Sequence, residues 1–264
     1  MPSTSHHKEV KISNAFSSDL ARTNSSYAAF ENNKLVRVLD PEQRPSPLME
    51  LVHDSLRAVI LSQSFSCVGA KAAVHKEDYR MGMYDQMNTP EATAGLAHDL
   101  FAFVQERPHM ESYFTTFITS FTEPHPVDEV HFEQLFWQQL QALHDLDAPL
   151  HAWDPSVSSD PEDPAFSFSF AGCAFFVIGL SPASSRWTRR FAWPTLVFNA
   201  HDQFEQLREH GKFESFRDTI RARESTLQGG FNALLNDFGE QSEARQYSGR
   251  AVEQDWQCPF HPHS

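Results

Sequence analysis

The chain has 264 residues, 40% of them hydrophobic and 23 of them phenylalanine, so it can bury a sizeable core and wholesale disorder is excluded. Its formal net charge of −14 argues against a nucleic acid or an anionic membrane surface as a partner. Its 3 cysteines are too few for a disulfide framework. With no signal-peptide pattern and no apolar run near ~18 residues, we expect a cytoplasmic protein.

The N-terminal part of the chain predicts a loose segment followed by helices. Residues 1–25 contain Ser, Thr, Asn and His without a hydrophobic period, which indicates a flexible arm ahead of one domain over 26–264. A proline-punctuated loop, "DPEQRPSPL", then leads into residues 48–60, whose apolar positions follow helical spacing. The next segment, "SFSCVGAKAAV", is expected to open a second helix at Gly69.

The following stretch predicts two more amphipathic helices with a strand between them. Apolar residues recur at helical spacing over 96–104 and again over 132–143. The segment "YFTTFITSF" is strand-like in its β-branched and aromatic content, although its pattern also admits a helix.

The centre of the chain contains the clearest hairpin pattern. A loop with three Asp-Pro pairs, "DPSVSSDPEDP", precedes "FSFSFAGCAFFVIGL". Phe166, Phe168 and Phe170 share one face, Gly172 allows a turn, and the returning strand is almost wholly apolar. A strand that is apolar on both faces has to be covered by helices on both sides of its sheet.

The C-terminal third adds one strand and more helices. Residues 195–198 form a short apolar strand, and Asn199 is the expected N-cap of a helix that carries His201 in its first turn. Apolar residues recur at helical spacing over 213–227. The chain is therefore expected to be a single α+β domain with a small, antiparallel-rich sheet covered by helices.

The usual nucleotide, hydrolase and zinc fingerprints are absent from the sequence. The segment "CPFHPH", which begins at Cys258, places one thiol and two imidazoles close together, but a frayed terminus is the favoured interpretation because no second ligand pair accompanies it. The segment "SSRWTRRF" contains Arg186, Arg189 and Arg190, either as a solvated basic loop or as a site that captures carboxylate or phosphate groups.

Several long, ordered motifs resemble the YqcI/YcgG family over about residues 60–262, and within it the branch of heme-dependent guanidine N-hydroxylases. That branch includes the pre-guanitoxin N-hydroxylase and the arginine N-hydroxylase of D-cycloserine biosynthesis. The resemblance implies a protein with heme b that uses O2 to hydroxylate a guanidine nitrogen. The motifs are "FSCVGAKAAV", "DPSVSSDPEDPAFSFSFAGCAFFVIGL", "SSRWTRRF", "LVFNAHDQFEQLR", "IRARESTLQG" and "FGEQSEARQYSGRAVEQDWQCPF".

Three residues inside these motifs are candidates for the iron ligand. His201 is the preferred candidate, as a neutral imidazole beside the sheet, while Cys67 would supply a thiolate and Cys258 lies near the terminus. The chain departs from many relatives at Ser66, where they have proline, and at Ser181, where they have histidine. A histidine at position 181 is therefore not available as a ligand in this protein.

The resemblance also suggests which charged residues contact the cofactor and the substrate. A guanidinium needs a carboxylate partner, and Glu243, with Tyr247 four residues later on one helical face, is expected to bind and orient it. Arg186 and Arg190 are expected to bind the two heme propionates. The alternative for Glu243 is a solvated ion pair with a nearby arginine.

Two other functions remain open at this level. One is a heme-binding sensor or carrier without turnover, and the other is a heme oxygenase that acts on an amine other than a guanidine. No flavin or ferredoxin segment is present, so electrons are expected from a separate donor or from peroxide.

Overall fold

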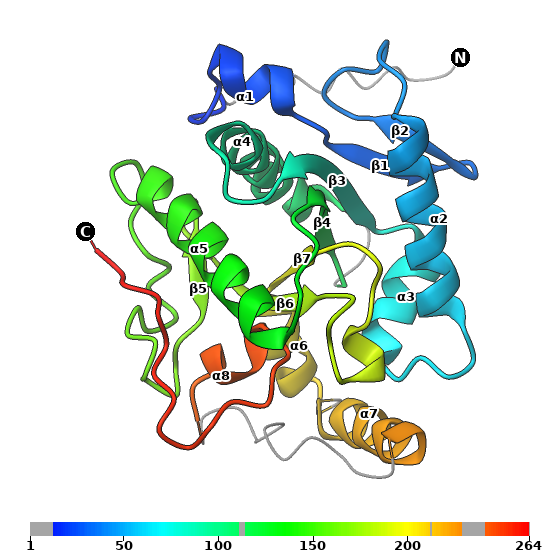
Figure 1. Cartoon of the computed structure of the whole chain (residues 1–264), viewed down its shortest axis with the longest axis vertical. Helices are drawn as coiled ribbons and strands as arrows, with labels where there is room; N and C mark the ends of the chain where they lie inside the picture. Colours follow the sequence, from blue (N-terminus) through cyan, green and yellow to red (C-terminus); the bar gives the residue numbers. More distant parts are fainter. Residues whose placement is uncertain (1–12, 111–113, 212, 229–240, 264) are drawn as a thin grey trace, which may run out of the picture.

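A seven-stranded sheet crosses the protein in the order β2-β1-β3-β4-β7-β6-β5, with helices on both faces (Figure 1). The structure, a computed structural model, describes residues 13–110, 114–211, 213–228 and 241–263. β3 and β4 are parallel, and the other neighbouring strands of this sheet are antiparallel. The strands are β1 (Ala28–Glu31), β2 (Lys34–Arg37), β3 (Tyr79–Gln86), β4 (Thr116–Glu123), β5 (Phe168–Phe170), β6 (Cys173–Leu180) and β7 (Thr195–Ala200).

The helices begin at residues that satisfy their first backbone N–H groups. Ser46 and Thr89 each accept a hydrogen bond from a backbone N–H of the helix that follows, and each precedes a proline that suits the first helical position. The helices are α1 (Asp19–Asn24), α2 (Pro47–Leu61), α3 (Val68–Lys76), α4 (Pro90–Glu106), η1 (Arg107–His109), α5 (Glu129–Asp147), η2 (Trp187–Arg189), α6 (Asp202–Glu209), α7 (Phe213–Gln228) and α8 (Ala244–Tyr247).

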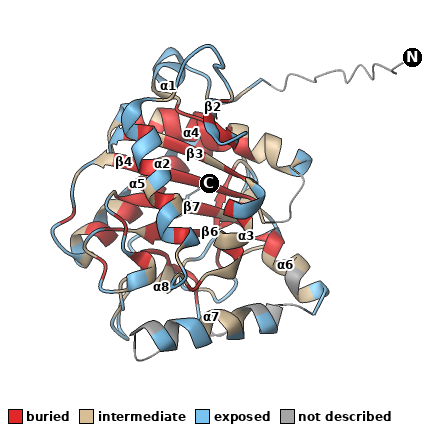
Figure 2. Cartoon of the chain, turned by 90° about the vertical axis from the view of Figure 1, so that its right-hand side faces the viewer, coloured by how far each residue is buried: buried red, intermediate tan, exposed pale blue. Residues whose placement is uncertain are grey.

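The two faces of the sheet carry separate hydrophobic clusters because successive strand residues point to opposite sides. Phe117 and Phe198 pack on the side of α4, α5 and α8, whereas Ile118 and Val197 pack on the side of α2 and α3. Figure 2 shows the buried residues following the strands and α4, while exposed residues lie on the outer side of α2. This α+β arrangement, with mostly antiparallel pairing, confirms the predicted fold class.

The predicted hairpin is present. β5 pairs with β6 in the register Phe168↔Phe175, and the two residues that connect them, Ala171 and Gly172, have φ of 53° and 70°. These left-handed values suit a tight two-residue hairpin turn, for which glycine is favourable. Phe168 and Phe170 are fully buried, as their alternation predicts.

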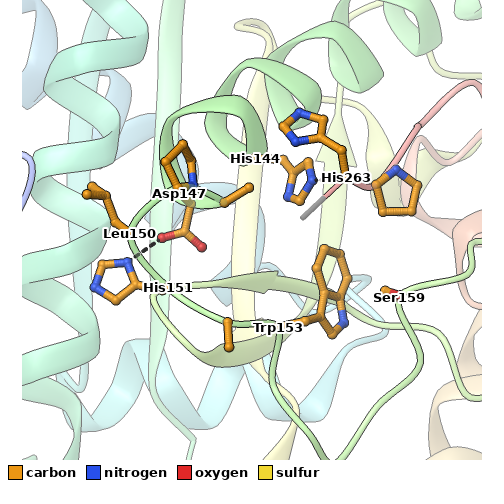
Figure 3. Close-up of a pocket in the computed structure, with 11 residues that line it drawn as sticks. His144, Asp147, Leu150, His151, Trp153, Ser159 and His263 are labelled. Atoms are coloured by element: carbon orange, nitrogen blue, oxygen red, sulfur yellow. Dashed lines mark hydrogen bonds and ion pairs between the residues drawn. The ribbon is translucent and has the colours of Figure 1, made fainter.

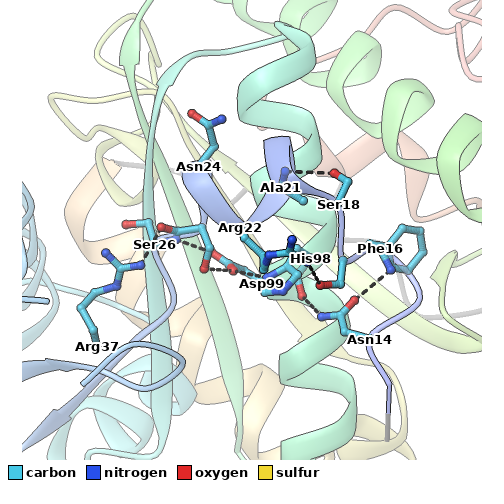
Figure 4. Close-up of polar contacts among 12 residues, drawn as sticks. Asn14, Phe16, Ser18, Ala21, Arg22, Asn24, Ser26, Arg37, His98 and Asp99 are labelled. Carbon is cyan, nitrogen blue, oxygen red and sulfur yellow. Dashed lines mark hydrogen bonds and ion pairs between the residues drawn. The ribbon is translucent and has the colours of Figure 1, made fainter. Parts of the chain in front are cut away.

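The N-terminal segment differs from the expected loose arm where the structure describes it. Ser18 caps α1, and the side chain of Asp99 on α4 anchors the residues that follow this helix (Figure 4). The fully buried Asp99 carboxylate accepts hydrogen bonds from Ser25 Oγ and Ser26 N at 2.6 Å and from Tyr84 OH at 2.8 Å. These bonds join the segment to the sheet and to α4.

Two further expectations are corrected. Asn199 does not cap a helix, because β7 continues to Ala200 and the N-cap position of α6 is His201. The C-terminal segment is not frayed over its described residues, because Phe260 is 1% exposed and His263 N donates a hydrogen bond to Nε2 of His144 on α5 at 2.9 Å. Among the described helices, none has the length and apolar composition needed to cross a membrane.

Candidate functional site

An apolar cavity of about 240 Å³ lies between the sheet and helices α2 and α3. Side chains of β4, β6 and β7 form its base, and α6, α7 and the η2 loop complete its walls. The hydrophobic lining residues are Leu56, Val59, Ile60, Phe65, Ala70, Ala73, Val74, Phe114, Ile118, Phe176, Ile178, Leu180, Phe191, Val197, Phe204 and Ile220. The lining is therefore mostly apolar, with polar groups at only a few points.

Cys67 supplies a sulfur atom to the wall of this cavity. It is the N-cap residue of α3, and its Sγ accepts a hydrogen bond from Ala70 N at 3.4 Å. The partial positive charge at the start of a helix stabilises an anion at this position. The small residues Gly69 and Ala70 of the same helix also line the cavity.

The arginines of the η2 loop also line the cavity, but they differ in their contacts. Arg189 is buried and donates to the backbone carbonyls of Gly179 and Tyr247, so it is a structural residue rather than part of a solvated loop. Arg190 donates from Nε to the carbonyl of Ser184 at 2.6 Å and lies over the ring of Trp187. Arg186 and Arg190 thus stand where they could contact anionic groups of a bound molecule.

The cavity has no carboxylate among the described residues that line it, and its remaining polar side chains are neutral amides and hydroxyls. Asn199, Gln203 and Gln246 supply the amides. The charged groups of the lining are therefore cationic, which suits a molecule that combines a large apolar body with carboxylates.

His201 directly follows β7 and lies outside the lining of the cavity, in a buried cluster with Ser167 and Glu243. Its Nδ1 is 3.1 Å from Ser167 Oγ, and its Nε2 is 3.3 Å from Oε1 of the half-exposed Glu205. Burial lowers the pKa of His201, which favours the neutral imidazole. Both ring nitrogens have protein partners, so the geometry favours Cys67 over His201 as the ligand for a metal-containing cofactor in the cavity.

Glu243 and Tyr247 belong to the same cluster as His201. Ser167 donates a hydrogen bond to Glu243 Oε2 at 2.7 Å, and the Tyr247 hydroxyl lies 3.3 Å from the same oxygen. Glu243 is 7% exposed, and its burial raises the pKa of its carboxyl group to about 7. The predicted solvated ion pair is therefore wrong for Glu243, while the predicted proximity of Glu243 and Tyr247 is confirmed.

An aromatic side chain of the cavity wall contacts this cluster. The ring of Phe176, which lines the cavity, is centred 5.3 Å from the ring of Tyr247 and 6.0 Å from that of Phe204. Gln246, one position before Tyr247, lines the cavity itself. The site residues predicted from the sequence thus form two adjacent groups. Cys67 and the arginines line the cavity, whereas His201, Glu243 and Tyr247 belong to the neighbouring buried cluster.

The C-terminal thiol and imidazoles lie elsewhere. Burial raises the pKa of Cys258 to about 12, so this thiol stays protonated and is a poor metal ligand. His263 borders a separate hollow of about 520 Å³ together with His144 and with His151, which is paired to Asp147 (Figure 3). In the part of the chain that the structure describes, no group of three or more His, Cys, Asp or Glu side chains is arranged to hold a metal ion.

Sequence reasoning missed two residues of these groups. Ser167 joins His201 to Glu243, yet its place between phenylalanines marks it only as the polar face of a strand. Ser66 lines the cavity beside Cys67, and the sequence offers only its difference from the proline of many relatives as a signal.

The fold and the cavity define a single-domain α+β protein with an apolar site that contains a thiol and arginines. Residues 56–261 match the model of the YqcI/YcgG family, and the chain belongs to this family. It is 26% identical over 205 residues to the uncharacterized protein YqcI of Bacillus subtilis (strain 168), an alignment that covers 74% of this chain and 80% of YqcI. No solved structure matches the chain.

Proposed function

We propose that this protein is a heme-dependent N-oxygenase that hydroxylates a guanidine nitrogen of arginine or a related small guanidine compound. The observation that carries the proposal is the cavity, which combines apolar walls, the sulfur of Cys67 and the arginines of the η2 loop. A heme needs one protein ligand, a dry apolar slot and partners for two propionates, and the residues present fit these requirements.

The fit is supported by one polar group that is buried without a partner. Ser66 lines the cavity, and its hydroxyl has no hydrogen-bond partner among the described residues. An unsatisfied buried hydroxyl destabilises a protein by about 1–3 kcal/mol, so a molecule in the cavity that accepted a hydrogen bond from it would stabilise the folded chain.

Each residue of the site has a separate task in the proposed reaction. Cys67 binds the iron, Arg186 and Arg190 pair with the propionates, and the apolar walls exclude water. When bound, the heme supplies the activation of O2. The net reaction inserts one oxygen atom of O2 into an N–H bond and reduces the other to water, with two electrons and two protons from an external donor. Alternatively, hydrogen peroxide replaces O2, the electrons and the protons together, and supplies one oxygen atom to the product and the other to water. Glu243 holds the guanidinium beside the wall that Phe176 forms.

The test of the proposed function starts with purified protein and hemin. We expect about one heme per chain, a spectrum that changes when arginine or another guanidine is added, and an N-hydroxylated product in the presence of O2 and a chemical reductant. A folded protein that takes up no hemin would overturn the proposal. A six-coordinate heme whose spectrum does not respond to substrate, and that forms no product, would favour a sensor or carrier. N-hydroxylation of simple amines but not of guanidines would indicate that the substrate is an amine other than a guanidine.

We predict that the double variant Arg186→Ala and Arg190→Ala retains heme less well than the wild type. Each lost guanidinium–carboxylate hydrogen bond costs about 1.5–3 kcal/mol when the carboxylate is left without a partner. The dissociation rate of heme, measured by transfer to an acceptor protein, should rise by at least about tenfold. Arg44→Ala, which removes an exposed arginine in a distant loop, is the control. Equal heme dissociation rates in all of these proteins would mean that Arg186 and Arg190 do not contact the propionates.

We predict that a cationic guanidine binds more tightly as the pH rises to about 7, the pKa of the Glu243 carboxyl group. Below this pKa the cation must displace a proton from the carboxyl group, so its affinity should change by up to about tenfold per pH unit. Glu243→Gln should bind the guanidine at least about tenfold more weakly at high pH and lose this pH dependence. Substrate titrations of the heme spectrum measure both effects, and parallel pH profiles in the two proteins would contradict the assignment.

A further inference from the structure

Three amide side chains line the apolar cavity around Phe176, namely those of Asn199, Gln203 and Gln246. Asn199 lies directly opposite Phe176 in the pairing of β6 with β7, and its Nδ2 donates a hydrogen bond to the carbonyl of Phe176 at 3.2 Å. The ring of Phe176 packs against the rings of Phe204 and Tyr247. Gln203 and Gln246 each directly precede one of these two aromatic residues. The three amides therefore belong to one part of the cavity wall.

These amides have hydrogen-bonding groups that the protein itself does not use. Asn199 Nδ2 donates to the carbonyls of Phe176 and Val197, which leaves its oxygen, Oδ1, without a donor among the described residues. Gln203 is 4% exposed, yet its side-chain amide forms no hydrogen bond with any residue that the structure describes. The same holds for the side-chain amide of Gln246 within the described chain. Polar groups at such buried positions normally have partners, so these amides are suited to a molecule in the cavity.

The oxygen of Asn199 determines which chemical group suits this part of the cavity. An amide oxygen accepts hydrogen bonds, so the complementary group of a bound molecule is a donor. A guanidinium carries several N–H donors and no acceptor. Glu243 leaves most of these donors without an acceptor, because its Oε2 already accepts hydrogen bonds from Ser167 and Tyr247. The amide oxygens supply further acceptors for such a group.

We propose that Asn199, Gln203 and Gln246 form the subsite for the guanidine group of the substrate, and that their amide oxygens accept hydrogen bonds from its N–H groups beside Phe176. The inference rests on the proposed function and names the residues that recognise its substrate inside the cavity. The ring of Phe176 offers an aromatic contact to a planar cation. A carboxylate at the same place would set oxygen against Asn199 Oδ1, so the subsite selects against anionic groups.

Gln203→Met tests the subsite, because methionine is a flexible side chain of similar length without an amide, and Gln134→Met, at an exposed glutamine of α5, is the matched control. Calorimetric titration of the heme-loaded protein with methylguanidine should give a dissociation constant at least about tenfold higher in Gln203→Met than in the wild type. Gln203→Glu, measured at about pH 8, should bind methylguanidine at least as tightly as the wild type, because a carboxylate is a stronger acceptor for a cation. Without ligand, the midpoint of thermal unfolding of Gln203→Met should not fall, because the amide that it removes has no partner among the described residues.

Three results would overturn the inference. Equal affinities of the wild type and Gln203→Met for methylguanidine would mean that the amide does not contact the guanidine group. A loss of affinity in Gln203→Glu as large as that in Gln203→Met would mean that the amide acts as a donor and not as an acceptor. A lower thermal midpoint of ligand-free Gln203→Met would mean that the amide stabilises the fold itself. In contrast, a wild-type protein that takes up no hemin, or that binds no methylguanidine, would show that the proposed function fails.

Discussion

Cys67→Ser is expected to remove the heme signature of this protein while leaving its fold intact. Cys67 is the N-cap residue of α3, and serine is among the best residues at this position, so the variant should keep or strengthen the start of the helix. Serine does not replace a thiolate as an iron ligand. Loss of a hydrogen bond to a metal ligand typically costs about 10–100-fold in affinity, and loss of the ligand itself should cost at least about 100-fold.

The spectrum of the ferrous–carbonyl complex measures this prediction directly. The wild type should show the red-shifted band typical of a thiolate-ligated heme, and Cys67→Ser should lose it. His201→Gln should keep the band, because His201 lies outside the cavity and bonds to Ser167 and Glu205. If His201→Gln loses heme while Cys67→Ser retains the carbonyl spectrum of the wild type, the ligand is His201, as the sequence alone suggested.

The sequence predicts the centre of the fold well because its pattern there is strong and local. The alternating phenylalanines of Phe168–Phe170 and the glycine of the turn specify a hairpin without knowledge of the rest of the chain. β1 and β2 escape prediction because each has four residues, and β3 escapes because charged residues and a glycine interrupt its pattern. Their stability comes from pairing with neighbours in the sheet, which a local pattern does not contain.

The sequence also predicts only part of the arrangement of the candidate site. The motifs of the family resemblance single out His201, Glu243 and Tyr247, and the structure brings these three together through Ser167. Their separation from Cys67 is a tertiary feature, because His201 follows β7, Glu243 and Tyr247 belong to the segment of α8, and Cys67 begins α3. Local sequence patterns do not contain how these three segments pack together, so a sequence-based choice of ligand between His201 and Cys67 has no firm spatial basis.

The buried Glu243 also predicts how the stability of the protein depends on pH. Burial raises the pKa of its carboxyl group from 4.5 to about 7, so the folded state holds a proton that the unfolded state has already released between these values. The free energy of unfolding decreases with rising pH wherever the unfolded state binds fewer protons than the folded state. The contribution of Glu243 is therefore fully present below about pH 4.5 and is lost as the pH rises through about 7.

Glu243→Gln should remove this loss, because a neutral amide has no proton to release. The shift from 4.5 to about 7 corresponds to a penalty of about 3 kcal/mol at alkaline pH, so the variant should be more stable than the wild type there by up to that amount. Urea unfolding of both proteins across this range measures the difference, and subtraction cancels the contributions of His201 and other groups. Glu42→Gln, at an exposed position, should change little at any pH. A stability difference between wild type and Glu243→Gln that does not vary with pH would mean that the carboxyl group has the same pKa in the folded and the unfolded chain. Glu243 would then be ionised at neutral pH and would bind a guanidinium without releasing a proton.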